Sequence, residues 1–274
     1  MTELSFQGTG SLPTGRDVSA EEIMALLKLP AARDQQAGEA ELETETHELE
    51  TETCELETET LDSFHLKAEP VPVDITRFPF RATAFLEIFL ENGQRFRGTA
   101  YFISYFRLAT AGHNLLYHEG TVDHVDVIVD VNGSLTVGAT RYTADTFDPH
   151  PEYFIGNRSR DFGVIRLVEE VGRAVGFFAL DDEAAFNRTV NVTGYPEASF
   201  FQAASSGTIR DIDAARVFYD AATSRGQSGG PAYLPHDDPE QIVAVGIHTH
   251  GVPPGTFRSG VRMTAGVKSW LLSA

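Results

Sequence analysis

The segment Gly226-Gln227-Ser228-Gly229-Gly230-Pro231 places one serine among three glycines. Because glycine has no Cβ, it adopts backbone conformations that other residues avoid, so the chain can turn sharply here and aim two N–H groups at one point. Two such donors about 2.7–3.1 Å from a developing negative charge form an oxyanion hole. The segment predicts a reactive serine in a catalytic turn; the alternative is a plain glycine-rich turn before a strand at Ala232–Leu234.

Two patterns earlier in the chain supply the partners that a reactive serine needs. Thr110-Ala111-Gly112-His113 puts a histidine at the end of an apolar strand, and Arg160-Asp161-Phe162-Gly163-Val164-Ile165 puts a carboxylate at the head of another. Each pattern alone is typical of a structural residue. A serine needs a base to take its proton, and the base needs a carboxylate to fix its tautomer. Together, His113, Asp161 and Ser228 predict a catalytic triad in that chain order.

Around these patterns, from about Ala68 onward, the chain alternates short apolar runs with turn residues, which is typical of an all-β barrel or sandwich. The dipeptides Asn92-Gly93 and Asn132-Gly133 are hairpin signals. Apolar residues at helical spacing predict a closing helix over Gly266–Leu272. We expect strands at Ala82–Leu90, Arg95–Ser104, Leu108–Ala111, Val125–Val131, Phe162–Val168, Thr189–Gly194, Ala232–Leu234 and Ile242–His248.

The charge is negative and unevenly distributed. The 274 residues carry a formal net charge of −19, which argues against a phosphate-binding surface and therefore against nucleic acid as a partner. Residues 1–65 hold 16 acidic and 3 basic side chains, so most of the excess lies there. The lone cysteine, Cys54, excludes an intrachain disulfide and a cysteine-based metal site.

Most of the acidic residues before position 65 belong to a seven-residue repeat. Glu-Leu-Glu-Thr-Glu-Thr begins at Glu41, Glu48 and Glu55, with one leucine per heptad instead of the two apolar positions of a coiled coil. Such dense like charge predicts a disordered acidic spacer; the alternative is a processed or binding segment. Before the repeat, the capping box Ser19–Glu22 predicts one short helix that ends by Pro30. We see neither a membrane span nor the basic start of a standard export signal.

From about residue 72 to its end, the chain resembles the chymotrypsin-like serine proteases. The resemblance rests on the three blocks around His113, Asp161 and Ser228. It implies two six-stranded antiparallel β-barrels with the active site between them and a C-terminal helix. It also implies an oxyanion hole formed by the N–H groups of Gly226 and Ser228, and no cofactor. Members of this family are usually secreted.

Within that family, the chain is similar to the bacterial glutamyl endopeptidases. The run from Tyr219 to Pro231, with Thr223 inside it, and the following Gly246-Ile247-His248 carry this likeness. The likeness implies that Thr223 and His248 bind the carboxylate of a substrate glutamate, most strongly when the imidazole is protonated. In secreted members a freed N-terminus also contributes. The alternative is a mixed polar pocket of loose specificity, and the sequence departs from this branch at Arg225, Thr249 and His250.

The sequence therefore predicts a serine endopeptidase that acts on polypeptides, prefers Glu before the scissile bond, and cuts itself within Glu41–Glu59. We expect residues 1–66 to be a largely disordered propeptide-like segment and 67–274 to be the protease domain. That domain comprises barrel one (about 70–170), barrel two (about 171–262) and a closing helix (264–273). We expect a monomer with no metal ion, no nucleic-acid partner and no membrane contact. Three alternatives stay open: a serine protease of other specificity, an inactive binding module, and a metal-dependent hydrolase built on His248 and His250.

Overall fold

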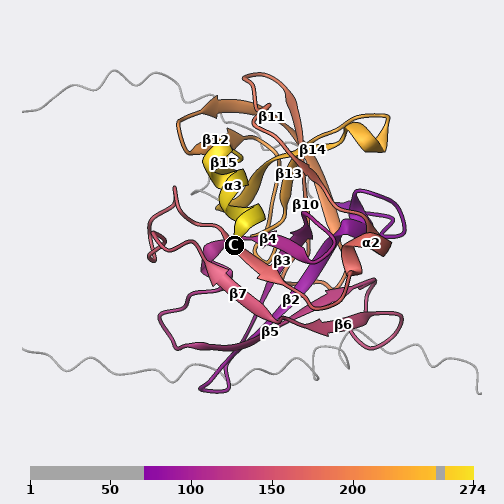
Figure 1. The fold of residues 1–274 in the computed structure, drawn as a ribbon. Coiled ribbons are helices and arrows are strands. Elements are labelled where there is room, and N and C mark those ends of the chain that lie inside the picture. Colours follow the sequence, from indigo (N-terminus) through magenta and orange to yellow (C-terminus); the bar gives the residue numbers. More distant parts are fainter. Residues whose placement is uncertain (1–70, 251–256) are drawn as a thin grey trace, which may run out of the picture. The chain divides into compact units, whose positions relative to one another are not determined.

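The structure is a computed structural model that describes residues 71–250 and 257–274 (Figure 1). In these residues the chain forms two β-sheets, three short 3-10 helices and two α-helices. The helix expected after Ser19 and the acidic repeat lie outside the described residues. None of the described helices has the length and hydropathy needed to cross a membrane. The helices are η1 (Phe80–Ala82), η2 (Gly112–Asn114), α2 (Val171–Val175), η3 (Pro239–Gln241) and α3 (Ala265–Ser273).

The first sheet contains seven strands in the order β6-β5-β2-β3-β4-β8-β7, all antiparallel. The inner strand β2 is apolar on both faces. Leu86 and Ile88 enter the core of this sheet, and Phe85 packs on the opposite face against Tyr195, which directly follows a strand of the other sheet. The outer strands β6 and β7 do not pair with each other in the described residues, so this sheet is an open half-barrel. Its strands are β2 (Thr83–Leu90), β3 (Arg95–Phe102), β4 (Arg107–Thr110), β5 (Val122–Val129), β6 (Thr140–Thr143), β7 (Thr146–Pro149) and β8 (Gly163–Arg166).

The second sheet closes into a six-stranded barrel, because β12 pairs with both β15 and β11. Alternate residues such as Val190, Val192 and Val217 fill its interior. Two short strands extend it: β1 pairs with β11, and β9 runs parallel to β14. The strands are β1 (Val71–Pro72), β9 (Ala179–Leu180), β10 (Thr189–Gly194), β11 (Ala203–Ile212), β12 (Arg216–Tyr219), β13 (Pro231–Leu234), β14 (Val243–His250) and β15 (Arg258–Arg262).

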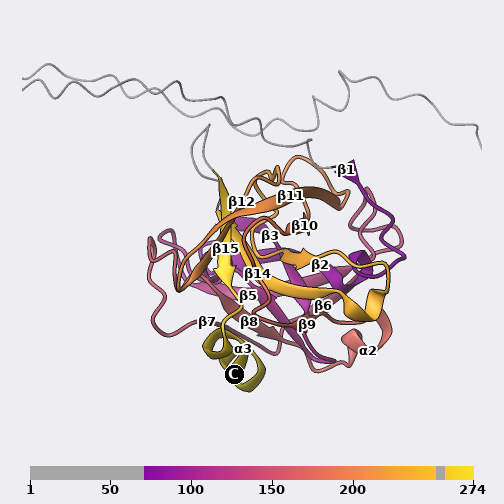
Figure 2. The same ribbon diagram turned by 90° about the horizontal axis from the view of Figure 1, so that it is seen from above.

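A shared apolar core joins the two sheets and the C-terminal helix. Tyr101 and Phe162 from the first sheet side pack in one cluster with Ile247 from the second and with Val267 and Leu271 from α3. The Thr264 hydroxyl accepts the Val267 N–H, which explains why the helix begins at Ala265. Figure 2 shows α3 at the outer edge of the folded body. The expected all-β fold with a closing helix is confirmed, and it differs in one respect: only the second barrel is closed by hydrogen bonds.

Candidate active site

His113 and Asp161 are brought together by the pairing of β4 with β8. His113 lies in η2, directly after β4, and Asp161 lies two residues before β8. Thr110 pairs with Gly163, so the end of one strand is beside the start of the other. The Nδ1 atom of His113 is 2.8 Å from Oδ2 of Asp161, and the His113 backbone N–H donates to Oδ1, also over 2.8 Å. Asp161 is 0% exposed, so this carboxylate holds the ring in one orientation.

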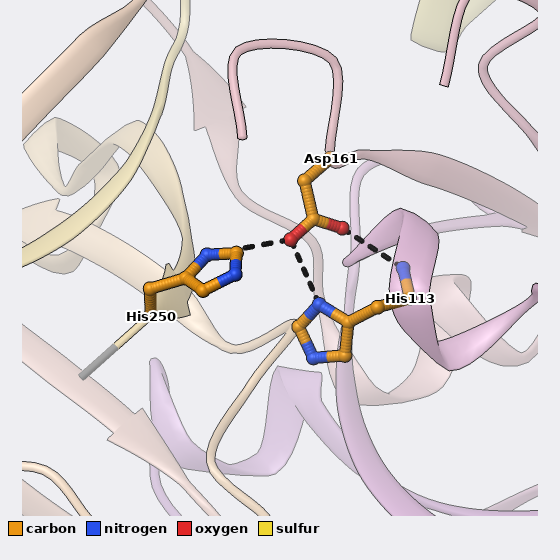
Figure 3. Close-up of side chains that lie close together, drawn as sticks. All are labelled: His113, Asp161 and His250. Carbon is orange, nitrogen blue, oxygen red and sulfur yellow. Dashed lines mark hydrogen bonds and ion pairs between the residues drawn. The ribbon is translucent and has the colours of Figure 1, made fainter. Parts of the chain in front are cut away.

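This contact decides which nitrogen of His113 can act as a base. An ionised carboxylate only accepts hydrogen bonds, so the ring hydrogen belongs on Nδ1 and the lone pair on Nε2. Figure 3 shows Nδ1 of His113 turned toward the buried carboxylate, and the His113 side chain is partly exposed and lines the neighbouring cavity. His113 is thus arranged to accept a proton from a group in the neighbouring cavity.

Ser228 lies in the turn before β13, and hydrogen bonds anchor this turn to the first sheet. The Ser228 carbonyl oxygen accepts from the Thr99 N–H and from Nδ2 of Asn114, each over 3.0 Å. The Thr99 hydroxyl donates to the Gly226 carbonyl over 2.8 Å. Because Asn114 follows His113 in η2, the serine turn and the histidine turn are fixed to one another.

The Ser228 hydroxyl points to a main-chain acceptor in this structure. It donates to the Thr249 carbonyl over 3.2 Å, and in the described part of the chain no hydrogen bond joins it to His113. Both residues line the same cavity, of about 490 Å³. Hydrogen bonds between catalytic groups are often long without substrate and tighten when it binds, so the present direction of the serine hydroxyl is compatible with pairing to His113.

Two backbone N–H groups of the serine turn have no acceptor in the described part of the chain. Among the described residues, nothing accepts the N–H of Gly226 or of Ser228. The Arg225 carbonyl accepts the Glu197 N–H over 2.7 Å, so the Gly226 N–H points the opposite way, as in any trans peptide. Gly226 has φ +90°, and a Cβ there would lie 2.5 Å from the Tyr195 carbonyl oxygen. Only glycine fits this position, and the turn leaves two N–H groups available for an oxyanion.

The cavity wall is positively charged. Thr223 and His248 line it, as do Arg225 and Arg258, and none of its described lining residues carries a carboxylate. The His248 ring is 2% exposed, and a 2.7 Å hydrogen bond joins its Nδ1 to the Tyr219 hydroxyl. Burial, helped by the nearby His250 and Arg258, lowers the pKa of His248 to about 3, although a Ser259 main-chain hydrogen bond acts in the opposite direction. The lasting positive charge of the wall therefore comes from the arginines, and His248 near neutral pH offers an uncharged imidazole to a carboxylate.

His250 approaches the same carboxylate oxygen of Asp161 as His113, and the centroids of the two imidazole rings are 5.6 Å apart. Its Nδ1 lies 3.5 Å from the same Oδ2 that faces His113 (Figure 3). This nitrogen has no hydrogen-bond partner among the described residues, and burial is the main reason that the pKa of His250 falls to about 4. The strand shifts register between His248 and His250, so the two rings do not form the His-x-His metal pair considered from the sequence. His250 groups instead with His113 and Asp161.

Three residues of this site carried no role in the sequence prediction, and His250 was considered there only as a metal ligand beside His248 and as a departure from the glutamyl branch. Thr99 and Asn114 hold the serine turn, His250 contacts Asp161, and Arg258 lines the cavity. Asn114 could have been suspected, since it directly follows His113. Arg258 had no local signal, because only strand pairing with Tyr219 brings it beside His248.

The fold and this group of residues define a serine-protease-like site, and comparison with known proteins gives the same class. The trypsin-like peptidase domain model matches residues 98–246, more than half of the chain, and the chain belongs to this family.

Particular relatives are glutamyl endopeptidases and other serine proteases. The glutamyl endopeptidase of Bacillus licheniformis is 30% identical over 117 residues, which cover 40% of this chain and 37% of that protein. A solved structure of a Glu endopeptidase in complex with MPD has a TM-score of 0.65 at 20% identity and covers 76% of this chain and 97% of its own. The thermostable serine protease AL20 from an extremophilic microorganism has a TM-score of 0.58 at 17% identity, covering 69% and 94%. The predicted likeness to chymotrypsin-like serine proteases, near the glutamyl endopeptidases, is confirmed.

Proposed function

We propose that this chain is a serine endopeptidase that cleaves polypeptides after acidic residues, with glutamate preferred. The observation that carries the proposal is the cavity shared by Ser228 and His113. Its described lining includes Arg225 and Arg258 and no carboxylate, in a chain whose net charge is −19. A cationic cavity beside a reactive serine selects an anionic side chain for the position next to the attacked bond.

The proposed reaction is acyl transfer through the triad. The Ser228 Oγ attacks the substrate carbonyl carbon while its proton passes to Nε2 of His113, and Asp161 stabilises the resulting imidazolium. The N–H groups of Gly226 and Ser228 receive the negative charge on the carbonyl oxygen. His113 then protonates the leaving amine, which breaks the peptide bond. Water repeats the same sequence on the acyl-enzyme and releases the new carboxyl terminus.

The proposed specificity combines neutral donors with a fixed charge. Thr223 contributes a hydroxyl and His248 a neutral imidazole, and both line the cavity. Arg258 supplies the charge, because a guanidinium stays protonated at any working pH and pairs well with a carboxylate. Hydrogen bonds to charged groups contribute ~1.5–3 kcal/mol, which corresponds to a ~10- to 100-fold preference for Glu over Gln.

Cleavage of peptides that differ only in the residue before the scissile bond tests this function. We expect kcat/KM to be highest for Glu, lower for Asp, and lower by one to two orders of magnitude for Gln and Leu. Ser228→Ala is the control and should cleave none. A preference for Leu would overturn the glutamyl assignment and leave the triad standing. Absence of cleavage, together with no labelling of Ser228 by a fluorophosphonate, would favour the inactive binding module.

A self-processing step extends the same proposal to the segment before the described residues. The glutamates of Glu41–Glu59 offer many bonds of the preferred kind ahead of the proposed protease domain, 67–274. We propose that residues 1–66 act as a propeptide that the chain removes by cutting in this repeat. Mass spectrometry of the purified wild type beside Ser228→Ala tests it, because equal processing of the two proteins would exclude self-cleavage.

A further inference from the structure

One carboxylate oxygen of Asp161 faces two imidazoles that come from different sheets. Its Oδ2 is 2.8 Å from Nδ1 of His113 and 3.5 Å from Nδ1 of His250 (Figure 3). One ligand atom from each of the three residues lies within 4.8 Å of the other two. Of these three residues, the proposed triad uses only His113 and Asp161, so the function proposed above gives His250 no role.

Two of the three separations among these atoms suit a small tetrahedral ion. Bonds of about 2.0–2.2 Å from zinc to nitrogen and oxygen separate neighbouring ligand atoms by about 3.3 Å. The two distances from Oδ2, 2.8 and 3.5 Å, lie on either side of that value. Side-chain movements that bring the two imidazoles, whose ligand atoms lie within 4.8 Å of each other, to a similar separation would complete the coordination geometry. Two imidazoles and one carboxylate are ligands that suit Zn²⁺ and Cu²⁺.

The groups around these three ligands hold the carboxylate in place and leave room for a fourth ligand. The His113 backbone N–H donates to Oδ1 of Asp161, which fixes the carboxylate and leaves Oδ2 for an ion, as outer hydrogen bonds do in metal sites. His113 and His250 both line the cavity, so a fourth position is open to water. Arg158 and Arg216 lie close enough to disfavour positive charge at His250. A site with three protein ligands and two such neighbours should bind zinc more weakly than structural zinc sites, which have four protein ligands.

We propose that His113, Asp161 and His250 form an inhibitory binding site for a divalent transition-metal ion, with Zn²⁺ as the best fit. A neutral imidazole that binds an ion through Nδ1 carries its hydrogen on Nε2. Metal binding thus moves the His113 proton from Nδ1 to Nε2, with no net release. Nε2 then has no lone pair for the Ser228 proton, and the attack step stops. The inhibition rests on the proposed function, whereas the binding does not.

Cobalt binding to the full-length Ser228→Ala protein tests the site without self-cleavage. Tetrahedral Co²⁺ has strong visible absorption, so a Co²⁺ titration reports both affinity and geometry, and Zn²⁺ should displace the signal. We expect His250→Phe and His250→Asn, each checked for unchanged near-UV circular dichroism, to weaken binding at least tenfold. Two variants are used so that a folding failure of one does not end the test.

His124→Phe is the matched control. His124 also pairs its Nδ1 with a carboxylate oxygen, that of Asp123 over 2.7 Å, on the exposed surface. In the described part of the chain, no second imidazole joins this pair. His124→Phe should leave the cobalt spectrum unchanged. Equal Co²⁺ affinity in the His250 variants and in the parent would overturn the site, as would a loss of the signal in His124→Phe.

The second test measures how Zn²⁺ inhibits peptide cleavage by the wild-type chain. We expect Zn²⁺ to abolish peptide cleavage at the concentrations that displace cobalt, EDTA to restore it, and the His250 variants to need at least tenfold more zinc relative to their own zinc-free rates. Binding without inhibition would overturn the inhibitory role. A wild type without peptidase activity in metal-free buffer would overturn the proposed function, while the cobalt arm would still decide the metal site.

Discussion

The side-chain amide of Asn114 donates a hydrogen bond to the main-chain carbonyl of Ser228 over 3.0 Å. The same Nδ2 atom donates to the Thr110 hydroxyl, also over 3.0 Å. Asn114 belongs to the turn that carries His113, and Ser228 belongs to a turn of the other sheet. One buried amide therefore sets the spacing between the proposed base and the proposed nucleophile, which come from different sheets.

Replacement of this amide should reduce both stability and activity. In Asn114→Ala, the Ser228 carbonyl keeps only its Thr99 hydrogen bond, so we expect the free energy of unfolding to fall by ~1–3 kcal/mol. A small displacement of reacting groups costs up to about 100-fold in rate, so kcat/KM should fall by ~10- to 100-fold. Peptide kinetics and urea unfolding measure the two effects.

Asn92→Ala is the control for this variant. The Asn92 amide also donates to a main-chain carbonyl, that of Glu119 over 2.8 Å, in an exposed hairpin away from the site. It should leave kcat/KM unchanged. An Asn114→Ala protein with wild-type kcat/KM would show that the amide has no influence on the position of Ser228.

Arg258 should determine the preference for a charged side chain. We expect Arg258→Gln to lower kcat/KM for a Glu peptide by at least tenfold and to leave the matched Gln peptide nearly unchanged, because only the charged substrate loses an ionic partner. Arg262→Gln is the matched control, since Arg262 lies on the same strand, pairs with Asp182 over 2.6 Å and is not one of the lining residues of the cavity. Equal losses for both peptides in Arg258→Gln would place its role in folding instead of specificity.

The sequence predicted the fold class and the candidate residues because both were written in short local patterns. The blocks around His113, Asp161 and Ser228 are each continuous in the chain, and strand pairing places His113 beside Asp161. Strands with apolar alternation, such as β2 and β10, were also predicted. The strands β12 and β15 were not, because Arg-Val-Phe-Tyr and Arg-Ser-Gly-Val-Arg show little alternation and are defined by pairing across the closed barrel.

The electrostatic properties of the site could not be predicted from the sequence for a related reason. The residue types at Thr223 and His248 indicated carboxylate binding, but the protonation of His248 depends on burial, which removes its charge. The approach of His250 to Asp161 and the place of Arg258 in the cavity wall both arise from β14 and β15, whose register shifts between His248 and His250. Such a shift is a property of the paired strands, and no local pattern encodes it.

The selectivity for Glu over Gln should not change with pH near neutrality. A histidine of ordinary pKa, about 6.5, would lose its charge between about pH 5.5 and 8 and would reduce the preference over that range. The pKa of His248 is lowered to about 3, so this ring stays neutral throughout, while Arg258 stays charged. We expect the ratio of kcat/KM for Glu and Gln peptides to vary less than about twofold. A ratio that falls tenfold as pH rises would assign the charge to His248.

The buried His248 should make the fold sensitive to acid. Its folded pKa, about 3, is below the unfolded value of about 6.5, so between these values the unfolded chain binds the extra proton. The free energy of unfolding therefore decreases as pH falls through this window, by up to ~1.4 kcal/mol per pH unit, and this loss is absent above it. Urea unfolding of the Ser228→Ala protein at several pH values gives the slope of the unfolding free energy against pH, which measures the number of protons taken up on unfolding. Adding His248→Gln should lower that number by about one. His118→Gln, the same change on the exposed surface, should not; an unaltered slope in His248→Gln would contradict the neutral buried ring.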